Sequence, residues 1–178
     1  MYRIIGIAGK AKAGKDTLAN YLCWNTNKDY VKVHFADILK TGAMQICQLD
    51  RWSVDTQEGK ESTIHWLNMT VRELLQKFGT AIRKEVDPDF WVKALLNKHT
   101  NDDIIIADVR FPNEAKAIKD AGGLLVRINR DSAGAGNHIS EIALDNYTNW
   151  DFVIDNNGTI EDLYRKGDEI LNLINTYE

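Results

Sequence analysis

The chain has 178 residues, of which 44% are hydrophobic and 27% are charged, and its formal net charge is −4. This length predicts a single domain with a substantial core, and the composition is ordinary for a globular protein. The negative charge argues against a nucleic-acid polymer as the main partner, because such binders usually carry a basic excess.

The first predicted element is an apolar strand over residues 2–8, which runs directly into a glycine-rich loop. Gly9 and Gly14 allow sharp turns that bring backbone N–H groups to phosphate oxygens. Lys15 adds a mobile positive charge for the β- and γ-phosphates, and a predicted helix over 15–25 adds the positive end of its dipole. This strand–loop–helix order favours nucleoside triphosphate binding over a plain glycine-rich turn.

The loop departs from the strict phosphate-binding pattern at one position. That pattern has Ser or Thr directly after the lysine, whereas this chain has Asp16 there and Thr17 next. Asp16 could bind Mg²⁺ through water while Thr17 bonds a phosphate. Alternatively, Asp16 is a solvated acid that stabilises the helix N-terminus. The loop alone leaves both interpretations open.

The rest of the chain alternates between strand and helix patterns. Strands are predicted over 30–36, 103–109, 123–129 and 151–155, and helices over 36–48, 70–84, 88–99, 112–121 and 159–176. This alternation predicts βαβ units and a parallel sheet covered by helices on both faces. Residues 49–69 and 131–140 fit neither pattern and are expected to be long, functional or disordered loops. Cys23 and Cys47 lack metal-ligand spacing, and we expect two buried, reduced thiols.

A carboxylate and a guanidinium lie at the carboxyl end of the third predicted strand. Asp108 lies at the carboxyl end of the strand over 103–109, and Arg110 comes two residues later. In a parallel sheet this end faces the ligand crevice, on the same edge as the glycine-rich loop. Asp108 is therefore a candidate Mg²⁺ ligand, and Arg110 is a candidate phosphate clamp. The alternative is an ordinary ion pair between the two.

The helix over 70–84 has a clear start signal and a polar face. Thr70 and Glu73 form a capping box. Arg72 and Gln76 share one face at the i, i+4 spacing, and a guanidinium with an amide suits a phosphate and a base edge. Helix geometry alone nevertheless favours a solvated surface for this face.

Later residues of the chain complete the predictions. Trp91 is expected in the core. Arg130, at the exit of the strand over 123–129, could reach a triphosphate or stack on adenine. His138 is a weak catalytic candidate, and a contact in a lid is the better interpretation. Thr159 is predicted to cap the last helix.

Four blocks of the chain resemble the deoxynucleoside monophosphate kinases of tailed bacteriophages, a branch of the P-loop nucleoside-monophosphate kinase superfamily. The blocks are residues 9–17 with their Gly-Lys-Asp-Thr ending, 71–80, 108–110 with Asn113-Glu114, and 137–141. Their spacing covers nearly the whole chain. The Gly-Lys-Asp-Thr ending is usual for this branch, which accounts for Asp16.

The resemblance implies a P-loop NTPase fold in the α/β class, with three α/β/α layers and a five-stranded, mainly parallel sheet. It implies one kinase domain over residues 1–178, with an acceptor-binding region at about 36–100 and a lid at about 130–145. Residues 49–69 would be a short connection where larger members carry a longer insertion.

The resemblance also implies roles for particular residues. The catalytic residues would be Lys15, Asp108, Arg110 and Arg130. The ATP phosphates and magnesium would be held by Lys12, Ala13, Gly14, Lys15, Asp16 and Thr17, with Arg130 and His138 on the ATP side and lid. The acceptor would be bordered by Phe35, Ala36, Asp37, Lys40, Arg72, Gln76, Gly79, Thr80, Arg83, Trp91 and Arg110. The metal ligands would be Asp16 and Asp108.

The implied reaction transfers the γ-phosphoryl group of ATP, with Mg²⁺, to a (deoxy)nucleoside 5′-monophosphate. The alternatives are a kinase of another phosphorylated metabolite, such as dephospho-coenzyme A or phosphomevalonate, a nucleotide-binding switch, or an inactive binding module. The sequence at 27–30 lacks the Asn-Lys-x-Asp spacing with which GTPases recognise guanine. Lys15, Asp108 and Arg110 argue against the inactive module.

The remaining expectations concern location and assembly. No apolar run reaches the length of a membrane span, and no secretory leader pattern is present, so we expect a cytoplasmic protein without a membrane partner. If the chain is phage-encoded, this is the host cytoplasm. The accepted base, the sugar, and the choice between monomer and homodimer stay open.

Overall fold

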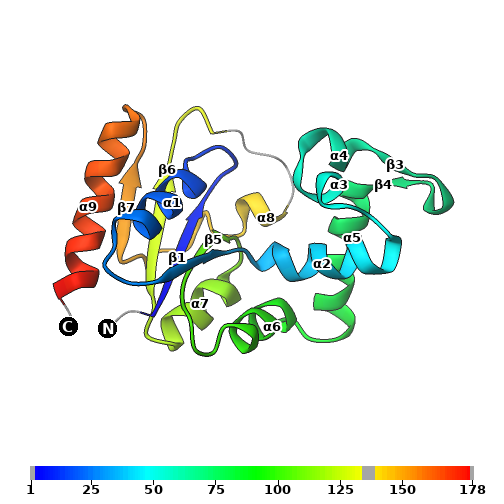
Figure 1. The fold of residues 1–178 in the computed structure, drawn as a ribbon, viewed down its shortest axis with the longest axis horizontal. Coiled ribbons are helices and arrows are strands. Elements are labelled where there is room, and N and C mark those ends of the chain that lie inside the picture. The colour runs from blue at the N-terminus through cyan, green and yellow to red at the C-terminus, as the bar shows by residue number, and fades with distance from the viewer. Residues whose placement is uncertain (1–2, 134–138, 177–178) are drawn as a thin grey trace. The chain divides into compact units, whose positions relative to one another are not determined.

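The computed structural model describes residues 3–133 and 139–176. It divides into two compact units, where the sequence predicted one domain. Unit 1 comprises Met1–His34 with His99–Glu178, and unit 2 comprises Phe35–Lys98. Unit 2 coincides closely with the range of about 36–100 predicted to bind the acceptor, although that role stays a prediction. Figure 1 labels the elements of both units.

Unit 1 is built on a five-stranded sheet in the order β2-β5-β1-β6-β7. Every pairing in it is parallel. The strands are β1 (Ile4–Gly9), β2 (Tyr30–Val33), β5 (Asp103–Val109), β6 (Leu124–Asn129) and β7 (Phe152–Asp155). All five lie at nearly the predicted bounds, which confirms the α/β fold with its parallel sheet.

The register brings three strand ends to one edge of the sheet. β1 is the middle strand, and its Ala8 is paired with Val109 of β5 on one side and Arg127 of β6 on the other. Residues 104–109 of β5 are all buried, as a strand covered on both faces requires. The segments that leave the carboxyl ends of β1, β5 and β6 are therefore neighbours.

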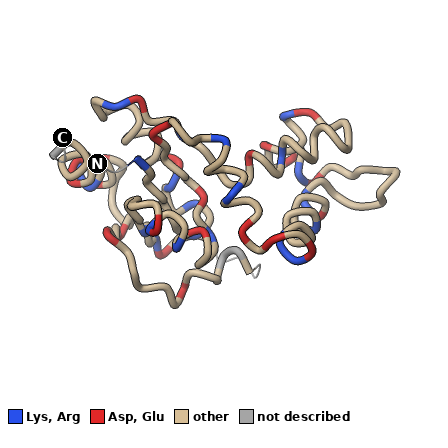
Figure 2. The backbone as a smooth tube through the Cα atoms, turned by 90° about the horizontal axis from the view of Figure 1, so that it is seen from below, with Lys and Arg blue, Asp and Glu red and all other residues tan. Residues whose placement is uncertain are grey.

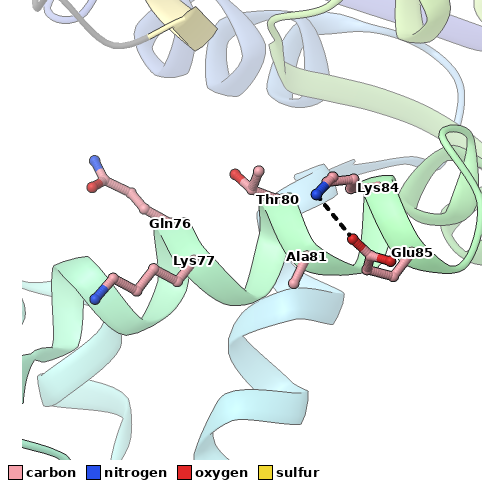
Figure 3. Close-up of a pocket in the computed structure, with 6 residues that line it drawn as sticks. All are labelled: Gln76, Lys77, Thr80, Ala81, Lys84 and Glu85. Carbon is pink, nitrogen blue, oxygen red and sulfur yellow. Dashed lines mark ion pairs between the residues drawn. The ribbon is translucent and has the colours of Figure 1, made fainter.

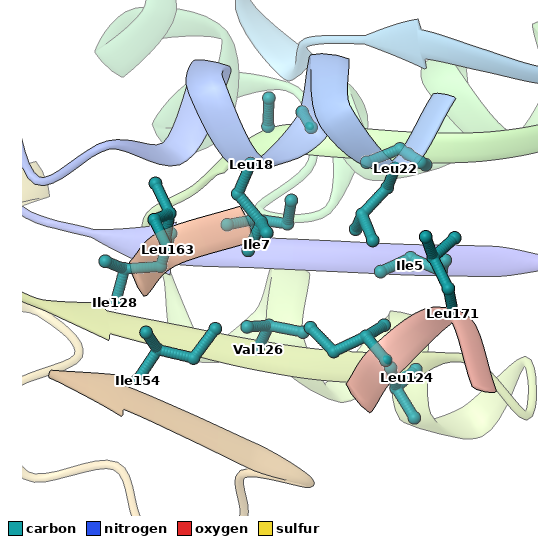
Figure 4. Close-up of a cluster of buried hydrophobic side chains, with 14 of the residues drawn as sticks. Ile5, Ile7, Leu18, Leu22, Leu124, Val126, Ile128, Ile154, Leu163 and Leu171 are labelled. Atoms are coloured by element: carbon teal, nitrogen blue, oxygen red, sulfur yellow. The ribbon is translucent and has the colours of Figure 1, made fainter. Parts of the chain in front are cut away.

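Helices cover both faces of this sheet, giving the predicted three layers. On one face lie α1 (Lys15–Asn25) and α9 (Ile160–Thr176). Their leucines pack against alternating β1 and β6 side chains, as Figure 4 shows for Leu18, Leu22 and Leu163. The other face carries α7 (Pro112–Asp120), where Ile118 lies against Gly6. A short helix, α8 (Ile139–Ile142), follows β6.

Unit 2 consists mainly of helices. Its longer helices are α2 (Phe35–Cys47), α5 (Val71–Glu85) and α6 (Phe90–Lys98). Thr70 caps α5 and Glu73 completes the capping box, which confirms the predicted start of this helix. In unit 1, Thr159 caps α9 in the predicted way, since its hydroxyl accepts from Asp162 N at 3.2 Å.

The expectation of a loop over residues 49–69 is wrong, because the segment is folded. It contains α3 (Arg51–Asp55), α4 (Gln57–Glu61), β3 (Thr63–Ile64), a 3₁₀ turn (His65–Leu67) and the start of β4 (Met69–Thr70). Asp50 caps α3 and Thr56 caps α4 through backbone N–H groups at 2.8 and 2.9 Å. Elements of two to five residues are too short to show a hydrophobic period, so the sequence pattern missed them.

Two further observations bear on the sequence-based expectations. Within the described residues, no helix has both the length and the apolar character to cross a bilayer. Figure 2 shows that basic and acidic residues are interspersed in both units.

Cys23 and Cys47 are free thiols. Each is half-buried, whereas the sequence predicted that both would be buried. Burial raises the pKa of Cys23 above its usual value.

Candidate active site

The loop between β1 and α1 has the backbone conformation that its glycines predicted. Gly14 has φ +107°, a conformation that L side chains rarely adopt. A Cβ on Gly9 would lie 2.6 Å from the carbonyl oxygen of Ile128, so only glycine permits this approach of the loop to β6. Lys12 also has a positive φ, of 65°, which is uncommon for a residue with a side chain.

Lys15 is held inside the loop that precedes it. Lys15 is only 9% exposed, and its Nζ donates to the carbonyl oxygen of Lys10 at 2.9 Å. Ala13 N donates to the same oxygen at 3.1 Å. The ammonium group therefore lies at the centre of the loop, where it can meet a ligand phosphate together with the backbone N–H groups.

Asp16 has partners that the sequence did not indicate. Its Oδ1 lies 3.1 Å from His34 Nε2 and 3.3 Å from Lys32 Nζ, and both partners belong to β2 or the residue after it. The hydrogen bond with His34, followed by the charges of His34 and Lys32, holds the pKa of Asp16 well below its usual value. Asp16 is thus an ionised carboxylate tied to the neighbouring strand, and not simply a solvated helix-terminal acid.

Asp108, near the carboxyl end of β5, and Arg110, directly after β5, lie at the same edge of the sheet. Asp108 is 8% exposed, and Arg110 is half-buried. The backbone around Arg110 is fixed by Glu114, a carboxylate only 2% exposed. Its Oε2 accepts from the N–H groups of Arg110 at 2.7 Å and Phe111 at 3.0 Å. Glu114 therefore sets the direction in which the chain leaves β5 and enters α7.

The exit of β6 is braced by the turn after β7. Asn157 Oδ1 accepts from the backbone N–H of Asp131, the residue after Arg130, at 2.9 Å. Asn156 Nδ2 donates to the carbonyl oxygen of Ala13, in the glycine-rich loop, at 2.8 Å. Arg130 itself is exposed. In this segment the sequence predicted only that Thr159 caps the last helix, and it did not indicate either contact, because each joins segments far apart in the chain.

A second set of contacts reaches the start of the loop. Lys10 Nζ lies 3.6 Å from Asp145 Oδ2, and Asp145 Oδ1 lies 3.5 Å from Arg127 of β6. The guanidinium of Arg127 also lies over the ring of Trp150, 5.6 Å from its centre. These contacts fasten the segment after α8 to the sheet.

In unit 2, Arg72 is the best-defined candidate for the acceptor phosphate. Its Nε donates to Glu61 Oε1 of α4 at 2.9 Å. Its Nη2 is buried and has no hydrogen-bond acceptor among the residues that the structure describes. Glu61 therefore orients the guanidinium through one nitrogen and leaves another nitrogen unsatisfied.

Two other predicted residues meet at the middle of α5. The indole Nε1 of Trp91 donates to the carbonyl oxygen of Gly79 at 3.1 Å, and Trp91 is buried, as predicted for a core residue. Arg83 Nη1 lies 3.4 Å from the same oxygen. A Cβ on Gly79 would be 3.2 Å from Leu39 of α2, so the small residue allows the two helices to pack closely.

An open pocket of about 390 Å³ lies along α5. Gln76, Thr80 and Lys84 succeed one another on one side of the helix, as Figure 3 shows, and Lys84 pairs with Glu85 at 3.2 Å. Lys77 and Ala81 complete the lining. Gln76 and Thr80, both predicted at the acceptor, are exposed here.

The other predicted acceptor residues lie at the start of α2. Phe35 is buried, while Ala36 and Asp37 are half-buried. Lys40 pairs with Asp55 of α3 at 2.9 Å, a contact that the sequence did not indicate. His138, predicted in the lid, lies outside the described residues. Thr17, predicted at the phosphates, is half-buried in the first turn of α1.

The carboxylate of Asp16 fits a magnesium ion that also binds phosphates. No group of three or more His, Cys, Asp or Glu side chains suited to a metal occurs within residues 3–133 and 139–176. Mg²⁺ needs no such group, because it binds through one or two carboxylates together with substrate phosphates and water. Asp16, whose side chain is 63% exposed and ionised, meets this requirement.

Comparison with known proteins gives two matches. The profile of a family described as deoxynucleotide monophosphate kinase matches residues 43–167, well over half of the chain. A protein of Acanthamoeba polyphaga mimivirus named "Putative deoxynucleotide monophosphate kinase" is 34% identical over 179 residues, which cover 90% of this chain and 92% of that protein. The profile match begins after the glycine-rich loop over residues 9–17, so the interpretation of that loop depends on its own geometry.

Proposed function

The chain belongs to the deoxynucleotide monophosphate kinase family, and from this premise we propose that it transfers the γ-phosphoryl group of ATP to the phosphate of a deoxynucleoside 5′-monophosphate. The products are ADP and a deoxynucleoside diphosphate. The observation that carries the proposal is the buried Lys15, whose Nζ lies 2.9 Å from Lys10 O inside the glycine-rich loop. A cation at the start of a helix, where the first backbone N–H groups have no intrahelical partner, is suited to a polyphosphate.

In this proposal, unit 1 binds the donor. Lys12 to Thr17 surround the phosphates of ATP, and Arg130 approaches them from the exit of β6. The support for these roles is the strand order, which makes the carboxyl ends of β1, β5 and β6 adjacent. Asp108 and Arg110, at the carboxyl end of β5, act on the transferred group at the same edge.

Unit 2 binds the acceptor. Arg72 and Arg83 bind its phosphate, and Gln76 and Thr80 contact the base along the pocket of α5. The buried and unsatisfied Nη2 of Arg72 supports this role, since a buried guanidinium nitrogen without an acceptor is costly until an anion meets it. Gly79, Trp91 and the start of α2 at 35–40 form the remainder of this binding region.

The reaction needs little proton chemistry. The attacking oxygen belongs to an already ionised phosphate, so no strong general base is required. Catalysis then consists of alignment and of neutralising the charge that spreads over the transferred group. Lys15, Arg110 and Arg130 supply positive charge from this chain. Mg²⁺, held by Asp16 and Asp108, would neutralise further phosphate charge when bound.

Residues 130–145 are proposed to close over the donor and exclude water, which would suppress hydrolysis of ATP. The described part of this range supports the proposal through Asp145, whose carboxylate pairs with Lys10 of the loop. Substrates of this kind are cytoplasmic metabolites, and we place the protein in that compartment.

The test is a substrate panel. ADP release is measured with ATP and Mg²⁺ and with each deoxynucleoside and ribonucleoside monophosphate in turn. We expect release to depend on at least one deoxynucleoside monophosphate. Release with none of them, but with another phosphorylated metabolite, would show a different acceptor, and hydrolysis indifferent to any acceptor would refute the kinase assignment.

Lys15→Ala tests the role of the loop in the same assay. We expect turnover to fall about 100-fold or more, because a positioned cation no longer meets the transferred charge. Lys166→Ala is the matched control, since it removes the same charge from the exposed pair with Glu169 on α9. Turnover near the wild-type value in Lys15→Ala would refute the assignment of the loop.

A further inference from the structure

Asn156, at the end of β7, is buried in a way that a turn residue does not require. It is 6% exposed, and within residues 3–133 and 139–176 the other buried polar or charged residues are Lys15, Asp108 and Glu114. Those three belong to the candidate site or hold it in place. A primary amide so far from solvent must find hydrogen-bond partners inside the protein.

The partners of Asn156 lie in two segments of the candidate donor site. Its side-chain Nδ2 donates to the carbonyl oxygen of Ala13, in the phosphate-binding loop, at 2.8 Å. Its backbone N–H donates to the carbonyl oxygen of Asn129, the last residue of β6, at 2.8 Å. One residue therefore connects the loop after β1 to the end of β6.

Gly14, the residue after Ala13, leaves room for the side-chain amide of Asn156. A Cβ on Gly14 would lie 2.6 Å from Nδ2 of Asn156, so the side chain occupies the space that glycine leaves open. The φ of +107° at Gly14 turns the chain from Ala13 into the first turn of α1, which begins at Lys15. The amide thus fixes the peptide at which the loop becomes the helix.

The next residue has a related contact of opposite polarity. Asn157 Oδ1 accepts from the backbone N–H of Asp131, beside Arg130. Asn156 acts as a donor to the loop, whereas Asn157 acts as an acceptor for the exit of β6. Because of this difference, replacement by aspartate should break the side-chain contact of Asn156 but keep that of Asn157.

We propose that Asn156 is a positioning residue for the donor nucleotide: its amide holds the Ala13–Gly14 peptide so that Lys15 and the first N–H groups of α1 meet the phosphates. The inference rests on the proposed binding of the donor at this loop. The bond is made before the ligand arrives, so the loop loses little conformational freedom on binding.

Asn156→Asp tests the proposal, because it replaces the donor by an acceptor of the same shape. A carboxylate oxygen would then face the carbonyl oxygen of Ala13. We expect kcat/KM for ATP to fall about 10- to 100-fold, the size of effect that follows loss of a buried hydrogen-bond partner, while KM for the acceptor stays within about twofold.

Asn157→Asp is the matched control. It adds the same charge one residue away, but its carboxylate still accepts from Asp131 N. We expect a change of no more than about threefold in kcat/KM for ATP, as for an exposed charge. Equal losses in the two variants would overturn the proposal, because they would show that charge near the loop is responsible.

A second pair of measurements separates positioning from stability. If Asn156→Asp does not fold, Asn156→Ala removes the donor without adding charge and is assayed well below its own Tm. Reduced ATP affinity in the folded variant supports the proposal; reduced Tm with unchanged kcat and KM for ATP overturns it. Binding of ATP measured by calorimetry without acceptor keeps this test separate from the kinase assignment, which fails only if no monophosphate is phosphorylated.

Discussion

Lys15 in unit 1 and Arg72 in unit 2 are proposed to bind the donor and acceptor phosphates, and the protein holds these two cations differently. Lys15 is 9% exposed and donates to a main-chain oxygen five residues earlier in the same loop. Arg72 has a side chain 37% exposed and is oriented by Glu61, a side chain 56% exposed on another helix. One cation is thus fixed by a loop and its buried supports, and the other by an ion pair at the surface.

The difference extends to the surroundings of each residue. The core of unit 1 joins β1, β6 and β7 to α1 and α9, and includes Ala13 of the loop itself. The core around the start of α5 consists of Val54, Ile64 and Val71, with partly buried neighbours. Changes near Lys15 should therefore affect stability and activity together, whereas changes near Arg72 should mainly affect affinity for the acceptor.

The largest effect is expected for Glu114→Ala in unit 1. This change leaves the N–H groups of Arg110 and Phe111 without the buried carboxylate that accepts from both. We expect a loss of about 2–4 kcal/mol in the free energy of unfolding, measured by urea denaturation, and a fall in kcat. Glu114→Gln keeps one acceptor oxygen and should lose less. A free energy of unfolding within about 0.5 kcal/mol of wild type would contradict the conclusion that buried contacts hold the candidate site of unit 1 in place.

Gly14→Ala should follow in size. The added Cβ would meet Asn156 Nδ2 at 2.6 Å, in a backbone conformation that alanine rarely adopts. We expect kcat/KM for ATP to fall about 10- to 100-fold and stability to fall about 1–3 kcal/mol.

Gly122→Ala is its control, since φ is +72° but nothing lies within 4 Å of the added Cβ. It should cost stability without changing the kinetics. Loss of ATP turnover in both variants would show that the specific approach of Asn156 to the loop is not what matters.

The same contrast explains what the sequence could and could not predict. The backbone conformation of the loop over residues 9–17 was identifiable because two glycines encode it within one short segment. The strands of unit 1 were identifiable because burial on both faces requires continuous apolar runs, such as residues 104–107. Each of these signals is local.

Several contacts that hold the site were not identifiable, because they join residues that lie eleven or more positions apart in the chain. Asn156 reaches Ala13 and Glu61 reaches Arg72 only after the fold has formed. Asp16 is a similar case, since the partners that keep it ionised follow it by sixteen and eighteen residues, on β2 and just beyond it. An isolated asparagine or glutamate carries no pattern that distinguishes such a role from a turn or a solvated surface.

Glu61→Gln tests the exposed side of the comparison. The neutral amide can still accept from Arg72 but attracts it less, so the guanidinium is less well oriented. We expect KM for the deoxynucleoside monophosphate to rise about three- to tenfold, and stability to change by less than about 1 kcal/mol, as for an exposed pair.

Glu58→Gln is the matched control on the same helix, because Glu58 forms no ion pair with any residue that the structure describes. It should leave KM unchanged. The effect of Glu61→Gln should shrink at high salt, where exposed pairs are screened. A loss of stability as large as that of Glu114→Ala would abolish the distinction between the two units.

The smallest effect concerns the alkaline limit of unit 1. Tyr30 begins β2 and is 7% exposed, and burial, with a smaller contribution from Asp103, raises the pKa of its phenol to about 12. The unfolded chain releases this proton near pH 10, so between pH 10 and 12 the folded state binds more protons than the unfolded state. This contribution to stability is complete below pH 10 and is lost as pH rises through 12.

Tyr30→Phe has no proton to release, so its stability relative to wild type should improve by about 1 kcal/mol between pH 9 and pH 11, measured by urea denaturation. A difference that stays constant over this range would show that water reaches the phenol, and that the start of β2 is less tightly packed than the rest of the sheet.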